Sequence, residues 1–485
     1  MTEGGLLKVL FAASEAAPFV KTGGLGEVIG SLPVALRRQG VDARIILPKY
    51  KAIPPSLREG IRHIKHIYVK LGWRNQYCGI EESEYREVPA YFIDNEYYFG
   101  RDCVYGYSDD EVERFAFFCR SVLEVLPHIG FMPDVIHCHD WQTGAIPVLL
   151  EAHYRHNDFY KSIRTLFTIH NLRYQGIYDR KILSDLLDLG DEYFTPDKLE
   201  FYGNVNMLKG GLVYANLINT VSPTYAQEIQ MPFFGERLDG LLRARKHQLF
   251  GILNGVDYDE YNPATDPLIF KNYDQDHLEH KVENKIKLQE QLGLYVREDV
   301  PMISIIVRLV AQKGLDLIAH VLDEILAMDI QLVVLGSGEW QYEDMFKNAA
   351  VRYPEKVSAN IFYDNVLAHR IYAASDLFLM PSLYEPCGLA QLFSMRYGTI
   401  PIVRETGGLK DTVQPYNEFT GEGNGFSFTN YNAHDMLYTI KRAVSFYHNK
   451  EMWYGLMRRA MQCDYSWNRS AKEYIKLYQQ LKAHQ

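Results

Sequence analysis

Short apolar runs alternate along the chain with stretches of helical periodicity. In the first half, five runs rich in aliphatic or β-branched residues predict strands, at 8–13, 43–48, 134–139, 165–170 and 217–222. Strands that alternate with helical patterns are typical of βαβ units with a largely parallel sheet. The first half is therefore expected to fold as an α/β domain.

A polar stretch interrupts this alternation near the middle of the chain. Residues 256–267 are dense in Asp, Asn, Pro and Tyr, which predicts a loop and a domain junction. The alternation then restarts, with predicted strands at 302–309, 331–338, 360–364, 376–382 and 399–406. From about residue 440 onward the pattern is helical and carries no strand signal.

These patterns predict two α/β domains and a helical end. We expect domains at 1–255 and 256–455, followed by a helical segment at 456–485 that packs back toward the first domain. The cleft between two such domains is the default ligand site. A length of 485 residues agrees with two or three domains.

Charge and cysteine content narrow the classes of function. The net charge of −10 argues against nucleic acid or an anionic membrane as the partner, because such proteins normally carry a basic surface. Six scattered cysteines without a C-x-x-C pair argue against a disulfide framework or a thiolate zinc site. The N-terminal residues fit neither a signal peptide nor a membrane span, so a cytoplasmic protein is expected.

A glycine turn near the N-terminus is the first candidate site. Gly23 and Gly24 separate a strand-like run from a helical one, and such a turn presents backbone N–H groups to phosphate, with Lys21 at its rim. A tight turn without a ligand explains the glycines equally well. The patterns of Walker A and dinucleotide-binding loops are both absent. A similar T-G-G-L motif recurs at 406–409.

Two cations follow the first predicted strand of the second half. Arg308 and Lys313 are expected at the carboxyl end of that strand, the edge where open α/β sheets bind ligands. There they could hold a diphosphate and neutralise the charge of a leaving group. The alternative is a pair of solvated surface charges.

Glu385 follows the predicted strand 376–382. Pro386 suits the first position of a helix, so we expect Glu385 at a helix start beside the amides of residues 387–389. A carboxylate together with free amides can form hydrogen bonds with sugar hydroxyls. The alternative is a capping Glu that stabilises the helix dipole.

Histidines end two predicted strands of the first half. His137 and His139 share a strand face and could bind a metal, but no third ligand is evident, so buried and hydrogen-bonded histidines are expected instead. His170 is a candidate for a polar contact in the cleft. Two D-x-D triplets, at 257–259 and 274–276, are interpreted as loop residues.

Taken together, these segments resemble bacterial glycogen synthases and plant starch synthases, glycosyltransferase family 5. The matching blocks span nearly the whole chain: KTGGLGEVIGSLP near the N-terminus, HCHDWQTG (137–144), TIHNLRYQG (168–176), NGVDYDEYNP (254–263), RLVAQKGLDL (308–317), PSLYEPCGLAQL (381–392) and TGGLKDTV (406–413). No single block is sufficient, but the ordered set is highly specific.

The resemblance implies a GT-B architecture, in which two Rossmann-like domains with parallel sheets face a deep cleft. It also implies a hexosyltransferase, ADP-glucose:1,4-α-D-glucan 4-α-D-glucosyltransferase. Glucose would pass from ADP-glucose to the 4-hydroxyl at the non-reducing end of an α-1,4-glucan, with retention of configuration. The expected partners are ADP-glucose and the glucan, and no metal or cofactor is implied.

The resemblance also assigns residues. Glu385 matches the essential carboxylate, Arg308 and Lys313 the phosphate contacts, and His170 a residue beside the donor glucose. The remaining matched positions are expected to bind substrate: Lys21, Gly23, Gly24, Asp140, Asn254, Tyr363 (stacking on adenine), Cys387, Gly388, Leu389, Thr406, Gly407 and Gly408.

The chain departs from the broader pattern at two positions, and alternatives stay open. Phe393 stands where many retaining GT-B enzymes have a second Glu, and Glu27 stands where many relatives have Asp. Attack from the same face and a covalent glycosyl-enzyme both give retention. Three rival functions remain. They are a transferase that uses UDP-glucose, a phosphorolytic glucan enzyme, and an inactive regulator that only binds glucan or nucleotide.

Overall fold

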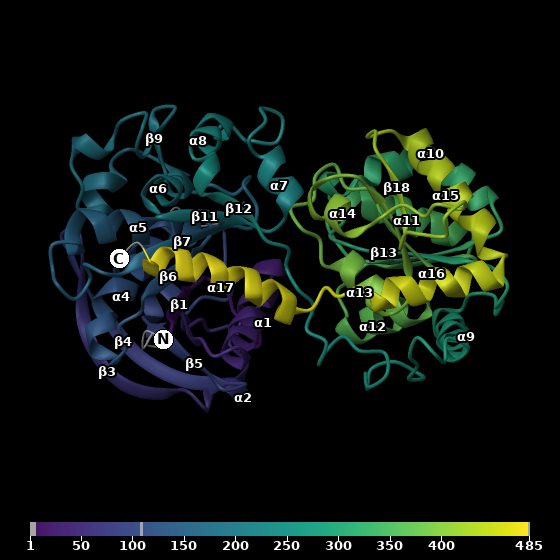
Figure 1. The fold of residues 1–485 in the computed structure, drawn as a ribbon, viewed down its shortest axis with the longest axis horizontal. Coiled ribbons are helices and arrows are strands. Elements are labelled where there is room, and N and C mark those ends of the chain that lie inside the picture. The colour runs from purple at the N-terminus through teal and green to yellow at the C-terminus, as the bar shows by residue number, and fades with distance from the viewer. Residues whose placement is uncertain (1–5, 107–109, 484–485) are drawn as a thin grey trace. The chain divides into compact units, whose positions relative to one another are not determined.

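The computed structural model describes residues 6–106 and 110–483, which form two α/β units (Figure 1). Unit 1 consists of Met1–Val221, Ala226–Gly255 and Trp467–Gln485, and unit 2 consists of Ser222–Tyr225 and Val256–Ser466. The residues of the predicted helical segment 456–485 therefore divide between the two units at Trp467.

Unit 1 is built on a mixed sheet that has nine strands in the described residues. Its order is β12 (Leu249–Gly251), β11 (Leu217–Thr220), β7 (Arg164–Ile169), β6 (Val135–His139), β1 (Lys8–Ala12), β2 (Asp42–Pro48), β5 (Val88–Asp94), β4 (Arg74–Tyr85) and β3 (Arg62–Leu71). The pairs from β12 to β5 are parallel, whereas β4 runs antiparallel to both of its neighbours. All five strands predicted in the first half are present.

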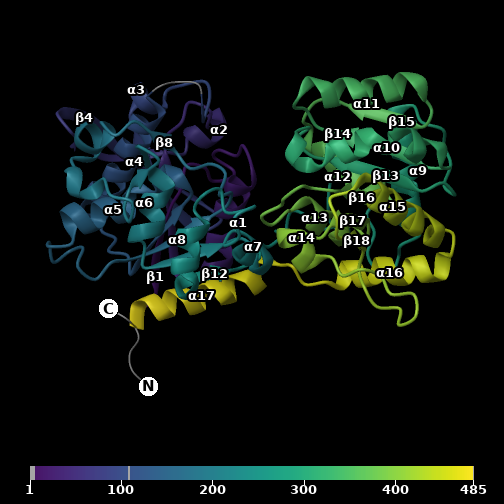
Figure 2. The same ribbon diagram turned by 90° about the horizontal axis from the view of Figure 1, so that it is seen from above.

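The helices of unit 1 include a long one from the end of the chain. They are α1 (Gly24–Arg38), α2 (Pro55–Arg58), α3 (Glu96–Phe99), α4 (Glu111–Val125), α5 (Ala145–Leu149), α6 (Met207–Tyr214), α8 (Asp239–Ala244) and α17 (Trp467–Ala483). Helix α17 buries Trp467, Ala471, Tyr474, Tyr478 and Leu481, which lie on one face at helical spacing. This face packs against α1, β6 and β7, and α17 runs across these elements (Figures 1 and 2).

Unit 2 is built on a parallel sheet that has six strands in the described residues. The order is β15 (Val357–Asn360), β14 (Gln331–Leu335), β13 (Met302–Ile306), β16 (Leu377–Met380), β17 (Ile400–Arg404) and β18 (Phe426–Phe428). The predicted strand 360–364 is wrong, because β15 ends at Asn360. Asp364 instead caps the next helix by accepting a hydrogen bond from the Leu367 backbone N–H.

Helices cover both faces of this sheet. Figure 1 shows α10 (Leu315–Ala327), α11 (Trp340–Arg352), α14 (Gly407–Thr412) and α15 (Ala433–Tyr447) on one side of β13. It shows α9 (His280–Leu292), α12 (Asn365–Ala374), α13 (Ala390–Arg396) and α16 (Lys450–Gln462) on the other. One further helix, α7 (Pro223–Glu228), begins within the short segment that groups with unit 2.

Each sheet reverses its direction of growth at one pair of neighbouring strands. In unit 2 the chain builds outward from β13 to β15 and then returns to β16, beside β13. In unit 1 the corresponding neighbours are β1 and β6. Loops that leave such a pair diverge, and the crevice at their carboxyl ends is where open α/β sheets bind ligands. No helix in the described ranges is long and apolar enough to cross a membrane.

Candidate active site

A buried ion pair lies at the carboxyl ends of β13 and β16. Lys313 follows β13 and Glu385 follows β16, and the Lys313 Nζ donates to Glu385 Oε2 at 2.6 Å. The Ser382 hydroxyl donates to the same oxygen at 3.0 Å. Both charged side chains are largely buried, with exposed fractions of 13% and 8%. Two of the predicted catalytic residues are thus in direct contact.

Backbone bonds join the two loops that carry this pair. The Leu383 N–H donates to the Gln312 carbonyl at 2.9 Å, one residue from Lys313. Gly314, which has φ +73°, lies so close to Pro381 that an added Cβ would stand 2.0 Å from the Pro381 carbonyl oxygen. A side chain cannot fit there, so the glycine allows the loops to close together.

The glycine turn after β17 packs directly against Glu385. The Gly408 N–H is shared between the carbonyls of Glu385 and Pro386, each at 3.2 Å. Gly407 has φ +44°, and a Cβ there would stand 1.9 Å from the Glu385 carbonyl oxygen. Thr406 is fully buried just before α14. The predicted residues Thr406, Gly407 and Gly408 are therefore neighbours of Glu385.

The helix expected to begin at Pro386 begins at Ala390 instead. Gly388 adopts φ +73°, which no right-handed helix can contain. The Gln391 side-chain amide donates to the carbonyls of Cys387 and Gly388, at 3.1 and 3.0 Å, and holds this loop. Glu385 consequently lies in a loop and not at a helix start, so the prediction of free helix-end amides beside it is wrong.

Two other predicted residues of unit 2 lie on the same edge. Arg308 is exposed two residues after β13. Tyr363 is 73% exposed and follows β15, which is two strands away from β13. Phe393 is buried and stacks on Tyr261 with a ring separation of 3.8 Å. Position 393, where many retaining GT-B enzymes have a second Glu, is thus part of the apolar core.

In unit 1, a pair of imidazoles lies where β6 and β7 end. The Nδ1 of His139 is 3.0 Å from the Nε2 of His170. Burial lowers the pKa of His170 to about 3 and holds the pKa of His139 well below its ordinary value. Both rings are therefore neutral at physiological pH and can exchange hydrogen bonds with uncharged groups.

Asp140 lies beside this pair in a strained backbone conformation. Its φ of +55° is rare for a residue with a side chain, and its Oδ1 accepts the His170 N–H at 2.8 Å. Burial raises the pKa of Asp140 to about 7, although the amides of His170 and Asn171 oppose that shift. A strained carboxyl whose pKa is near 7 is typical of a functional site.

His137, in contrast, is held entirely by structural partners. Its Nδ1 is 2.8 Å from the Tyr478 hydroxyl, and its Nε2 is 2.5 Å from the Thr168 hydroxyl. The Thr168 hydroxyl donates to Asn219 Oδ1 at 2.5 Å, and the Asn219 amide donates to the Tyr474 hydroxyl at 3.1 Å. Helix α17 thus completes a buried polar network below the edge. The expectation of a hydrogen-bonded structural histidine is confirmed.

Glu15 organises the N-terminal glycine turn, and the sequence interpretation missed it. Its carboxylate accepts hydrogen bonds from the Thr22 N–H, from the Thr22 hydroxyl at 2.8 Å and from the Gly23 N–H at 3.3 Å. The Tyr105 hydroxyl donates to it at 2.5 Å. An acid three residues beyond a strand and seven before the turn is the signal that could have identified it.

The other predicted residues of unit 1 lie on loops at the same edge. Lys21 forms an ion pair with Glu27 of α1, and Gly23 and Gly24 stand at the start of that helix. Asn254 is 5% exposed, and its Oδ1 has no hydrogen-bond partner among the described residues. A buried acceptor without a partner is a position where a bound molecule can donate.

Neither unit offers a metal site in the part of the chain that the structure describes. No group of three His, Cys, Asp or Glu side chains there could hold a metal ion. The two D-x-D triplets stabilise turns instead: Asp257 accepts the Asp259 N–H and Asp274 accepts the Asp276 N–H, both at 2.9 Å.

Comparison with known proteins identifies a family for each part of the chain. Residues 8–244 match the starch synthase catalytic domain, and residues 285–453 match the glycosyl transferases of group 1. The chain is 60% identical to a glycogen synthase of Desulforamulus reducens over 98% of its own length and 99% of that protein. It is 58% identical to a glycogen synthase of Geobacillus stearothermophilus, with 98% of each chain covered.

Solved structures agree with this assignment. The catalytic domain of starch synthase IV from Arabidopsis thaliana, bound to ADP and acarbose, superposes with a TM-score of 0.91 at 36% identity, covering 99% of this chain and all of that chain. Sucrose-phosphate synthase from Thermosynechococcus elongatus has a TM-score of 0.63 at 17% identity, with 99% of this chain and all of that chain covered, which shows the shared fold alone. The predicted GT-B fold is confirmed.

Proposed function

The chain belongs to the glycogen synthase family, and from this premise we propose how its two sheet edges carry out the family's reaction. The protein is a glucosyltransferase that elongates an α-1,4-glucan with glucose from ADP-glucose. The observation that carries the assignment of residues is the buried Lys313–Glu385 pair at the reversal point of the unit 2 sheet.

Unit 2 supplies the charges that the donor needs. When the bond between the glucose C1 and the ADP oxygen breaks, the departing ADP gains a negative charge. Lys313 and Arg308 are placed on loops after β13, where their positive charges stabilise that oxygen. Lys313 is largely buried, so its charge is only weakly screened by water.

Glu385 acts at the sugar. Glucosyl transfer passes through a transition state with positive charge on the ring, and a carboxylate beside the ring stabilises it. The bonds from Lys313 and Ser382 fix the orientation of this carboxylate before the donor binds. Cys387, Gly388, Leu389 and the turn at 406–408 contribute backbone groups around it.

We assign the transfer to attack from the same face. The acceptor 4-hydroxyl oxygen forms the new bond to C1 as the ADP oxygen leaves, and the hydroxyl proton passes to the departing phosphate. The position expected for a second carboxylate holds the buried Phe393, so the double-displacement route lacks its usual pair. No metal takes part in this scheme, because the two cations hold the diphosphate.

Unit 1 supplies polar groups for the sugar and one cation for the donor. His170 and Asp140 are proposed to contact the glucose hydroxyls, and Asn254 offers an acceptor that has no partner among the described residues. Lys21 with the turn at Gly23 and Gly24 is proposed to contact the donor, and Tyr363 of unit 2 is proposed to stack on adenine.

The partners proposed are ADP-glucose and glycogen or a malto-oligosaccharide, and the compartment proposed is the cytoplasm. The cysteine chemistry supports a reducing compartment, since none of the six cysteines forms a disulfide in the part of the chain that the structure describes. Four of them are buried, and burial raises the pKa of Cys78 and of Cys119 to about 12.

A donor-and-primer assay tests this proposal. The protein is incubated with glycogen and either ADP-glucose or UDP-glucose, and nucleotide release and glucan extension are measured. ADP-glucose should be the preferred donor, and Glu385→Ala should abolish transfer. The control Glu290→Gln, at an exposed site of unit 2, should keep full activity. Preference for UDP-glucose, or no ADP release with primer present, would overturn the proposal.

A further inference from the structure

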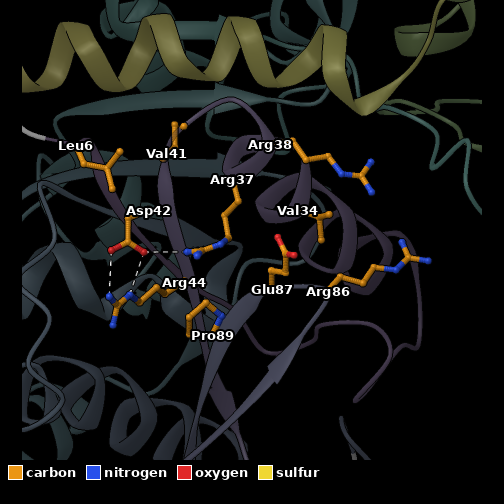
Figure 3. A pocket seen from close by; sticks show the side chains of 11 residues that line it. Leu6, Val34, Arg37, Arg38, Val41, Asp42, Arg44, Arg86, Glu87 and Pro89 are labelled. Atoms are coloured by element: carbon orange, nitrogen blue, oxygen red, sulfur yellow. Dashed lines mark hydrogen bonds and ion pairs between the residues drawn. The ribbon is translucent and has the colours of Figure 1, made fainter.

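Unit 1 contains a cavity of about 610 Å³ at the amino ends of its strands (Figure 3). The cavity is lined by the last turn of α1, by the first residues of β2 and by the turn that precedes β5. The candidate active-site residues all follow the carboxyl ends of strands. This cavity therefore lies at the opposite edge of the sheet and is not part of the site described above.

The lining is strongly basic. Its charged residues are Arg37, Arg38, Arg44, Arg86, Asp42 and Glu87. Four guanidinium groups against two carboxylates leave two positive charges in one cavity. The whole chain has a net charge of −10, so this concentration of arginine runs against the composition of the protein.

Asp42 organises two of the arginines. Arg44 binds its carboxylate through two parallel bonds, Nε to Oδ1 at 3.1 Å and Nη2 to Oδ2 at 3.0 Å. Arg37 donates to Oδ1 at 3.0 Å, as Figure 3 shows. Burial raises the pKa of Asp42, but the bonds and charges of Arg44 and Arg37 outweigh it and lower the pKa below its ordinary value. One carboxylate thus orients two guanidiniums, which retain further N–H donors.

The other side of the cavity is formed by a strained turn. Arg86 and Glu87 are the two residues between β4 and β5, with φ of +48° and +65°. Turns with two such residues favour Asn and Gly, because long side chains are disfavoured in left-handed backbone. In Figure 3 the side chains of Arg86 and Arg38 extend toward the same side. The backbone of this turn does not favour Arg86 and Glu87, so we attribute their presence to a requirement for charged groups at the edge of the cavity.

We propose that this cavity binds a small phosphate monoester. A phosphate monoester carries close to two negative charges at neutral pH, which matches the two positive charges of the lining. Planar guanidinium groups bind phosphate oxygens through paired hydrogen bonds. The volume of about 610 Å³ lies in the range of small-molecule sites.

The cavity is separated from the donor turn by the length of one helix. Helix α1 begins at Gly24, directly after the turn at Lys21–Gly23, and ends at Arg38 in the cavity. Its 15 residues span about 22 Å. The proposed site is thus additional to the glucosyl transfer and does not rest on it.

Calorimetric titration of glycerol 3-phosphate into the full-length protein at low ionic strength tests this site. We expect one binding event, with no binding of glycerol. Arg86→Asn should weaken binding on the order of tenfold, because it removes one charged contact. It should not lower the stability, since Asn tolerates the backbone of this turn. Glu87→Gln should tighten binding, because it removes a repelling charge without changing the shape.

Matched variants and probes distinguish binding in the cavity from binding elsewhere on the protein. Arg352→Asn removes an exposed arginine of unit 2 and should leave binding unchanged. Arg308→Gln should also leave it unchanged, because Arg308 belongs to the proposed donor site. Loss of binding in Arg308→Gln, equal affinity in Arg86→Asn, or equal affinity for the dicarboxylate malonate would overturn the proposal. So would the absence of binding.

Discussion

The carboxyl edges of the two sheets differ in how they treat charge. In unit 1 burial suppresses charge: it lowers the pKa of His170 to about 3 and raises the pKa of Asp140 to about 7. In unit 2 two opposite charges are buried together as the Lys313–Glu385 pair, with Arg308 exposed nearby on the same edge. The His139–His170 pair of unit 1 is therefore neutral, whereas the Lys313–Glu385 pair of unit 2 is charged.

This difference matches the two kinds of chemical group that the reaction handles. Sugar hydroxyls are uncharged, and neutral imidazoles can both donate to them and accept from them. A diphosphate that leaves with an added charge needs fixed cations. The two α/β units have similar topologies, so their different roles in binding sugar and diphosphate come from how the residues at their carboxyl edges are buried and paired.

The glycine turns that share the T-G-G-L motif show the same contrast. In unit 1 the carboxylate of Glu15 holds Thr22 and Gly23. In unit 2 the backbone carbonyls of Glu385 and Pro386 hold Gly408. The first turn is held by a side chain that a substitution can remove, whereas the second is held by the backbone of the loop that carries Glu385.

Breaking the ion pair of unit 2 should have the largest effect. Lys313→Met leaves the Glu385 carboxylate buried without its cation, so the free energy of unfolding should fall by about 3–5 kcal/mol. Transfer should fall on the order of a thousandfold, because a charge that stabilises the leaving group is lost. Urea unfolding and ADP release measure the two effects.

The double variant Lys313→Met/Glu385→Gln separates stability from chemistry. Removing both charges should recover most of the stability but none of the activity. If the single variant keeps normal turnover, then Lys313 does not stabilise the leaving group.

Substitution of the two glycine turns should have a smaller and unequal effect. Gly407→Ala puts a Cβ 1.9 Å from the Glu385 carbonyl oxygen at φ +44°, so it should lower the free energy of unfolding by about 2 kcal/mol or more. Gly23→Ala meets no atom within 4 Å and has an extended φ of −163°, so its cost should stay below about 0.5 kcal/mol. Equal costs in urea unfolding would show that the two turns are not anchored differently.

The buried Asp140 of unit 1 should make the free energy of unfolding depend on pH. The pKa of Asp140 is about 7 in the folded protein and 3.8 as its ordinary value, so the unfolded chain releases this proton first. The free energy of unfolding should therefore fall as the pH rises from about 4 to about 7. Asp140→Asn should remove that loss, since Asn stays neutral and tolerates φ +55°. Urea unfolding of the unaltered protein and of Asp140→Asn at pH 5 and pH 8 measures this. An equal change in the free energy of unfolding for both proteins would contradict the prediction.

The sequence predicted the five adjacent strands β11, β7, β6, β1 and β2 of the unit 1 sheet and missed the strands at both of its ends. All predicted runs of the first half are strands, but β12, β5, β4 and β3 of the same sheet were not predicted. β3 exposes most of its residues and lacks an apolar run, whereas β5 has such a run and was overlooked. The helix predicted from Pro386 fails for a different reason. Gly388 adopts a left-handed conformation that depends on its contact with Gln391, a tertiary feature that helical periodicity does not report.

The candidate site could be predicted as a set of residues but not as a geometry. Lys313 and Glu385 were both identified, but their contact joins positions 72 residues apart and depends on β13 lying beside β16. Glu15 lies three residues beyond β1 and seven before Thr22, but only the fold shows that its carboxylate accepts hydrogen bonds from that turn. The tyrosines of α17 reach His137 and Asn219 only because that helix folds against β6 and β7.

Titration of ADP tests most directly the claim that unit 2 supplies the charge for the donor. The protein, Arg308→Gln and His170→Gln are compared by calorimetry under identical salt. Arg308→Gln should weaken ADP binding tenfold or more, because a charged contact to phosphate is lost. His170→Gln should change the affinity by less than about twofold, since its neutral ring is assigned to the sugar. Unchanged ADP affinity in Arg308→Gln, or a larger loss in His170→Gln, would contradict the account.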